Sequence, residues 1–122
     1  MTAPSLYDRM GGAPTIQAIA EVIYKKMIGD PALAGFFANV YDVPAQISHH
    51  AAYITSVLGG PDEYHGRDLR TAHDGLAGLS DVHFDKVLVH LADTLHEVGV
   101  PADIIPDVVK VADRARAEVL GR

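Results

Sequence analysis

The chain has 122 residues, which is the size of one domain, and we expect a single domain over residues 1–122. Its 48% hydrophobic share is typical of a globular protein, and its net charge of -6 argues against nucleic acid or an anionic membrane as a partner. The absence of cysteine excludes disulfides, thiolate metal sites, iron–sulfur clusters and cysteine nucleophiles. With no leader peptide visible and no apolar run near the ~20 residues of a membrane span, we expect a cytoplasmic protein.

The chain begins with two predicted helices. The first, over residues 5–10, should end at Gly11-Gly12, because glycine disfavours a helix interior. Pro14 suits the first turn of the next helix, over residues 13–28, since its missing N–H costs nothing there. The apolar face of this second helix consists of Ile16, Ile19, Ala20, Ile23, Tyr24 and Met27.

A third helix is predicted after a compact corner over residues 31–37. Asp42 should be its N-cap, because a carboxylate there accepts a bond from an otherwise unpaired backbone N–H. Gly59-Gly60 ends it. The buried positions expected along this helix are Ile47, His50, Ala51, Ile54, Val57 and Leu58.

The span 59–79 is long for a connector in so small a domain, and such loops usually carry function. It holds one short helical candidate, residues 68–74. Ser80 is predicted to cap an amphipathic helix that Gly99 closes, and Pro101 to open the last helix. No segment alternates with period two, so the sequence predicts an all-α fold.

Three histidines suggest a metal site. Imidazole is costly to bury without a partner and is the commonest side-chain ligand for transition metals. On a helical wheel one face is shared by Gln46, His49, His50, Tyr53 and Val57, and His73 lies in the long loop. One interpretation is a metal or metallocofactor held between these two elements. The other is that one imidazole of the adjacent pair is in solvent and the other is hydrogen-bonded.

Other side chains are open to two interpretations. Tyr24 is either a core tyrosine bonded to a backbone carbonyl or a hydrogen-bond donor aimed into a pocket. Phe36 and Phe37 are either core packing or rings stacked on a flat cofactor. His90 is off the apolar face of its helix, and we expect it to be solvated.

Several segments, taken in order, carry a family resemblance. They are Ser-Leu-Tyr-Asp-Arg-Met-Gly-Gly (5–12), the Tyr24 helix, Phe36-Phe37, Leu-Gly-Gly-Pro (58–61), Tyr-His-Gly-Arg-Asp-Leu-Arg-Thr-Ala-His (64–73), His-Phe-Asp-Lys-Val-Leu-Val-His-Leu (83–91) and Gly-Val-Pro (99–101). Together they resemble the group I truncated haemoglobins over about residues 5–119. The resemblance implies a truncated globin fold, a two-over-two helical sandwich around a haem, with an extended loop before the proximal helix.

The resemblance also implies roles for individual residues. His73 matches the proximal histidine that ligates haem iron, and Tyr24 matches the distal tyrosine that donates a hydrogen bond to bound dioxygen. Phe37 matches the phenylalanine packed on the porphyrin. Phe84 and Val87 match proximal haem contacts.

The distal helix carries the remaining matches. Gln46 and His50 match positions that often carry hydrogen-bonding side chains. His49 falls where some family members carry a histidine that binds the iron when no external ligand is present. We expect His49 to be the distal iron ligand and His50 to be a hydrogen-bonding partner or the alternate ligand. Arg70 is a candidate partner for the haem propionates, as are Lys25 and Arg67.

The implied function is reversible binding of O2, and of NO and CO, at a haem b (iron protoporphyrin IX). Conversion of nitric oxide to nitrate, which is a nitric oxide dioxygenase activity, is also implied, with an unidentified reductase as partner. We expect a monomer or a weak dimer. The alternative is a six-coordinate haem protein used in redox sensing or electron transfer. A di-iron bundle fits poorly, because it needs Glu-x-x-His pairs and the chain has none, and a plain helical interaction module is the simplest rival.

Overall fold

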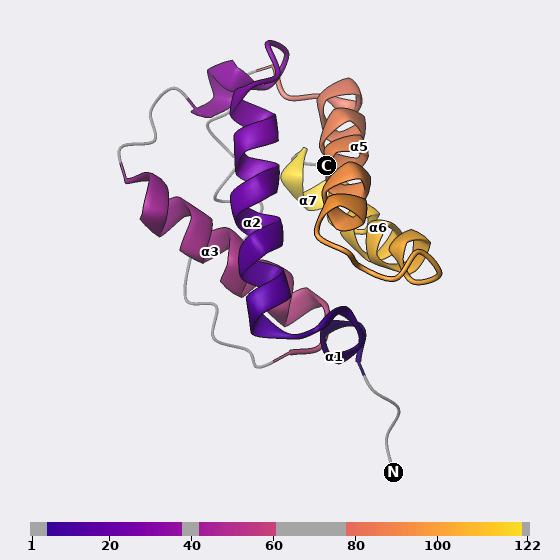
Figure 1. The fold of residues 1–122 in the computed structure, drawn as a ribbon. Coiled ribbons are helices and arrows are strands. Elements are labelled where there is room, and N and C mark those ends of the chain that lie inside the picture. Colours follow the sequence, from indigo (N-terminus) through magenta and orange to yellow (C-terminus); the bar gives the residue numbers. More distant parts are fainter. Residues whose placement is uncertain (1–4, 38–41, 61–77, 121–122) are drawn as a thin grey trace.

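Helices are the regular elements of the computed structural model, which describes residues 5–37, 42–60 and 78–120 (Figure 1). In chain order they are α1 (Leu6–Met10), α2 (Ala13–Ile28), the 3-10 helix η1 (Ala34–Phe37), α3 (Val43–Val57), α5 (Asp81–Glu97), α6 (Ile105–Asp113) and α7 (Arg116–Val119). The described ranges hold no strand, which confirms the all-α prediction. The predicted helix over residues 68–74 lies outside them.

The long helices form two pairs. Helix α2 packs on α3, and α5 packs on α6 (Figure 1). The pairs meet where α2 lies against α5. This is the two-over-two arrangement of helices that the sequence predicts.

The chain enters α2 through a tight turn at Gly11 and Gly12. Their φ angles of 112° and 72° lie in the left-handed region, which an L side chain rarely adopts. The short helix α1 is tied to the end of α3, because the backbone N–H of Tyr7 donates to the carbonyl of Leu58 at 3.0 Å. Helix α1 ends at Met10 and is capped by Gly11, which confirms the predicted end of the first helix.

Both predicted N-caps are confirmed in position. The Oδ1 atom of Asp42 accepts a bond from the backbone N–H of Ala45 at 3.1 Å at the start of α3. Ser80 is the N-cap of α5, where its backbone N–H donates to Nδ1 of His83 at 3.1 Å. An imidazole nitrogen here takes the place that a glutamate oxygen fills in a usual capping box.

The last helix differs from the prediction. It begins at Ile105 rather than at Pro101, and it is divided into α6 and α7. Pro106 lies in its first turn and has no N–H to extend the helix backwards. At the break, Arg114 and Ala115 donate to carbonyls three residues back instead of four, which tightens the turn between α6 and α7.

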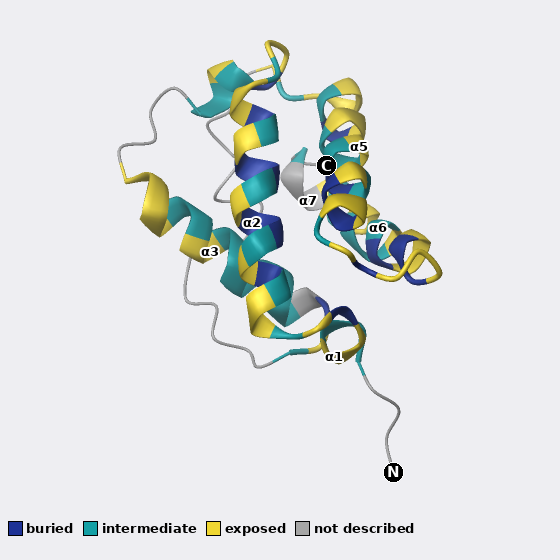
Figure 2. Cartoon of the chain, viewed as in Figure 1, coloured by how far each residue is buried: buried dark blue, intermediate teal, exposed yellow. Residues whose placement is uncertain are grey.

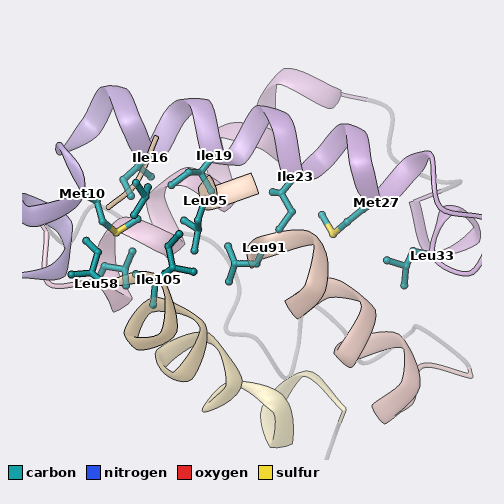
Figure 3. Close-up of a cluster of buried hydrophobic side chains, with 13 residues drawn as sticks. Met10, Ile16, Ile19, Ile23, Met27, Leu33, Leu58, Leu91, Leu95 and Ile105 are labelled. Atoms are coloured by element: carbon teal, nitrogen blue, oxygen red, sulfur yellow. The ribbon is translucent and has the colours of Figure 1, made fainter. Parts of the chain in front are cut away.

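The core lies between the two helix pairs (Figures 2 and 3). Its cluster of buried apolar side chains consists of Met10, Ile16, Ile19, Ile23, Met27, Leu33, Leu58, Leu91, Leu95, Val100, Ile104, Ile105 and Val108. Residues of α2 recur in it every three or four positions, so the predicted apolar face of that helix is confirmed.

Candidate functional site

Tyr24 is a buried aromatic residue on α2, with 3% of its surface exposed. Its ring meets that of Phe37 edge-on, at 5.5 Å between centroids and 80° between planes. The imidazole of His50 lies on another side, at 6.4 Å and 53°. The corner after α2 and the helix α3 therefore bring Phe37 and His50 to the same tyrosine.

Gln46 and His50 form a pair on α3, one helical turn apart. Their Nε2 atoms are 3.1 Å apart, and both side chains are half-buried. Which of the two nitrogens donates depends on the imidazole tautomer and the amide orientation. An amide, an imidazole and a phenol thus lie close together in a poorly solvated region.

His49 is placed differently from its neighbour. The helical wheel puts it with Gln46 and His50, whereas the structure leaves it exposed. Consecutive side chains on a helix diverge by about 100°, so the two imidazoles cannot both face Tyr24.

Phe84 and Val87 lie one turn apart on α5. Phe84 is buried, with 7% exposed, and Val87 is half-buried against the core cluster. The guanidinium of Arg116 lies over the Phe84 ring, 4.8 Å from its centroid. Like Tyr24, Phe84 is buried but is not a member of the core cluster.

Two histidines of α5 contact the corner that follows α2. The ring of His83 meets Phe36 edge-on at 5.1 Å and 78°. The Nε2 atom of His90 lies 2.8 Å from Oδ2 of Asp30. The prediction that His90 is solvated is therefore wrong, because this carboxylate comes from a turn that the helical pattern of α5 cannot reveal.

Asp30 is stabilised in its charged form. The hydrogen bond from His90, followed by that from the backbone N–H of Ala32, holds the pKa of this carboxyl below its ordinary value of 3.8. The backbone carbonyl of Asp30 also accepts from the N–H groups of Leu33 and Ala34, both at 2.9 Å. Asp30 therefore organises the start of the corner that carries Phe36 and Phe37.

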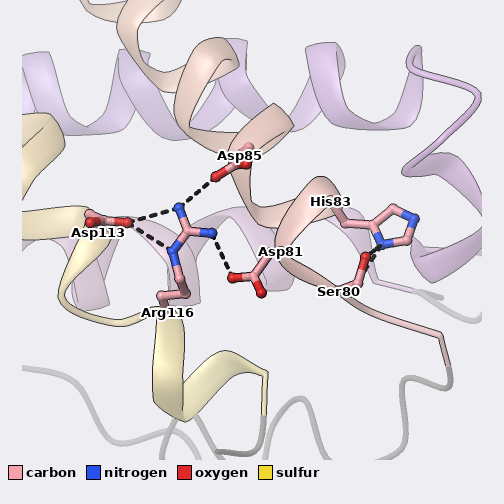
Figure 4. A network of polar contacts seen from close by, with 6 residues as sticks. All are labelled: Ser80, Asp81, His83, Asp85, Asp113 and Arg116. Carbon is pink, nitrogen blue, oxygen red and sulfur yellow. Dashed lines mark hydrogen bonds and ion pairs between the residues drawn. The ribbon is translucent and has the colours of Figure 1, made fainter.

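Sequence reasoning missed the group around Arg116 (Figure 4). The guanidinium bonds to Asp81 at 2.8 Å, Asp85 at 2.6 Å and Asp113 at 3.0 Å. The carboxylates of Asp85 and Asp81 hold the pKa of Arg116 above its ordinary value. The i, i+4 spacing of Asp81 and Asp85 was a signal for a cation partner, but only the fold identifies that partner.

The remaining predicted site residues are exposed or lie outside the described part of the chain. His73, Arg70 and Arg67 lie outside the described residues, and Lys25 is exposed. In the parts of the chain that are described, no three metal-ligating side chains are gathered to hold an ion directly. An open, mainly apolar depression of about 520 Å³ lies between α5 and α6 and is lined by none of the predicted site residues.

Comparison with known proteins decides the family. The family model described as bacterial-like globin matches residues 5–120. Proteins named group 1 truncated hemoglobin match over most of their length, including one from Tetrahymena pyriformis, 34% identical over 97% of this chain and 96% of its own. The chain belongs to the group 1 truncated haemoglobins. A relative from a Synechocystis strain is 39% identical over 88% of this chain and 89% of its own.

Solved structures of truncated haemoglobins share the fold. The Fe(III) form of the Tetrahymena pyriformis protein superposes with a TM-score of 0.91, at 34% identity over 98% of this chain and all of that chain. A 2/2 hemoglobin from Synechococcus, described as cyanomet and with covalently attached heme, gives a TM-score of 0.90 at 38% identity and similar coverage. Membership of this family implies a haem-binding globin.

The described residues of this truncated haemoglobin fit that cofactor. The polarity and hydrogen-bond donors beside haem iron determine how it handles a diatomic ligand, and Tyr24, Gln46 and His50 can supply such donors. Aromatic and aliphatic side chains suit the flat, apolar faces of a porphyrin, and Phe37 lies beside the polar set. The helices in the described ranges include none with the length and apolar character needed to span a membrane.

Proposed function

We propose that this truncated haemoglobin reversibly binds dioxygen, and also NO and CO, at the iron of a haem b. The observation that carries the proposal is the grouping of a buried phenol with a paired amide and imidazole at Tyr24, Gln46 and His50. The phenol comes from α2, and the amide and imidazole come from α3.

Haem, when bound, supplies the iron to which the diatomic ligand coordinates. The protein residues determine how firmly that ligand is held. We propose that the Tyr24 hydroxyl donates a hydrogen bond to that ligand, and that the edge-on ring of Phe37 supports the tyrosine. The Gln46–His50 pair offers a second donor, because either side chain can turn a proton toward the ligand.

We assign the other contacts from the family resemblance. His73 is the proposed proximal ligand and Arg70 a propionate partner, both outside the described residues. Phe84 and Val87 of α5 are proposed to line the proximal side. His49 is the proposed ligand in the absence of dioxygen, and its exposed position means that it would have to move inward to bind iron.

Oxidation of nitric oxide is the reaction that we propose for this site. One nitric oxide and one dioxygen, with one electron from a reductase, give one nitrate. The hydrogen bonds of Tyr24 and the Gln46–His50 pair favour it by keeping dioxygen bound until nitric oxide arrives.

The test is the absorption spectrum of the haem-loaded protein in its ferric and ferrous states, with and without CO and O2. We expect haem uptake, a stable O2 complex, and nitrate production when NO is added to that complex. Failure to take up haem would refute the proposal. Rapid autoxidation without nitrate would instead support the six-coordinate redox or electron-transfer protein.

A further inference from the structure

Arg116 is bound along every edge of its guanidinium by carboxylates from two other helices. Its Nη1 atom bonds to Asp81 and its Nη2 atom to Asp85, both on α5. Its Nε atom bonds to Asp113 at the end of α6. The planar group, with 24% of the side chain exposed, is therefore fixed in both position and tilt.

The central carbon of the same guanidinium lies over the Phe84 ring, 4.8 Å from its centroid. Asp81, Phe84 and Asp85 lie within about one turn of α5, so the carboxylates that hold the plane are beside the ring that the plane covers. A guanidinium can bond carboxylates through its edge while it lies over an aromatic ring. An ammonium group also attracts the ring, but it has no planar fork whose tilt the carboxylates can fix.

We infer that Arg116 is a positioning residue for the haem, acting through Phe84. The inference rests on the proposed function, which puts Phe84 on the proximal side of the haem. Phe84 is buried, with 7% exposed, and the guanidinium of Arg116 is one of its neighbours. Arg116 lies over one face of the ring, so its removal would leave the ring free to tilt toward that side.

The experiment compares Arg116→Ala and Arg116→Lys with the haem-loaded wild type. We expect haem release to an excess of apomyoglobin to accelerate about three- to tenfold in Arg116→Ala, the range of a partly exposed cation–ring contact. The Soret circular dichroism and the ratio of haem rotational isomers in NMR spectra should change with it. Arg116→Lys should restore these signals only in part, because its ammonium still attracts the ring but has no planar fork to fix the tilt of the contact.

Arg114→Ala is the matched control, since Arg114 is an exposed cation two residues earlier. It should release haem at the wild-type rate. Wild-type release and Soret dichroism in both Arg116 variants would overturn the inference, while a wild type without haem would refute the proposed function first. If Arg116→Ala does not fold, wild-type haem signals in Arg116→Lys alone would overturn it.

Discussion

His90 of α5 bonds to Asp30 in the turn after α2, with 2.8 Å between Nε2 and Oδ2. The two side chains are 60 residues apart in sequence and are 22% and 15% exposed. Asp30 also accepts backbone hydrogen bonds at the start of the corner that leads to Phe37, whose ring contacts Tyr24. The Asp30–His90 bond therefore ties α5 to this corner.

The Asp30–His90 pair should make the free energy of unfolding depend on pH in the acid range. The pKa of Asp30 in the folded protein is below the ordinary value of 3.8. The ionised carboxylate therefore contributes its full share to the free energy of unfolding above pH 3.8, and this share is lost as the pH falls through the folded-state pKa. Asp30→Asn should therefore be less stable than the wild type at neutral pH, and the gap should narrow in acid. Urea unfolding from about pH 6 to about pH 3 measures this. A gap that does not change with pH, or an equal effect of Asp103→Asn at an exposed turn position, would contradict it.

Gly60 should tolerate no side chain. A Cβ there would lie 2.7 Å from both Cγ2 of Thr55 and Cδ2 of Tyr7, so the ring of Tyr7 would have to move. We expect Gly60→Ala to cost about 1–3 kcal/mol in the free energy of unfolding. Gly35→Ala is the control, since a Cβ at Gly35 meets nothing within 4 Å. Equal melting temperatures for the two variants would show that the close approach is unimportant.

Tyr24→Phe tests the proposed hydrogen bond to dioxygen while keeping the ring contact with Phe37. A bond to a group carrying negative charge contributes about 1.5–3 kcal/mol, so the O2 dissociation rate should rise by tenfold or more. Stopped-flow replacement of O2 by CO measures that rate. The CO dissociation rate should change much less, because CO accepts hydrogen bonds weakly, and equal changes for both gases would indicate a steric effect instead.

His49 and His50 should have different functions, which single substitutions can distinguish. If His49 binds iron in the unliganded ferrous protein, ligand association is slowed by the fraction of molecules in that state. We expect His49→Ala to abolish the six-coordinate spectrum and raise the CO association rate. His50→Ala should leave six-coordination intact and raise the O2 dissociation rate, because His50 lies with Gln46 and Tyr24. The reverse pattern would assign the iron ligand to His50.

The helices of this chain were predictable because local signals mark their ends. Asp42 and Ser80 are the N-caps of α3 and α5, as the sequence predicts, and Gly11 is the C-cap of α1. Pro106 marks the true start of α6, but the apolar residues before it extended the predicted helix backwards.

The long-range polar contacts were not predictable in the same way. His90 reads as solvated because its partner, Asp30, belongs to a different element. The stacking of Arg116 on Phe84 likewise depends on how α7 folds back onto α5. Periodicity reports which face of a helix is apolar, but not which charged side chain from elsewhere in the chain meets the other faces.

Tyr24 and Phe84 are buried without belonging to the core cluster that joins α2, α5 and α6. Substitutions that keep the aromatic ring at these two positions, such as Tyr24→Phe, should therefore disturb the cluster less than substitutions within it. If the site binds gases as proposed, ring-conserving substitutions there could alter gas affinity with little effect on the scaffold. The same separation makes the chain a convenient starting point for designing other haem sites.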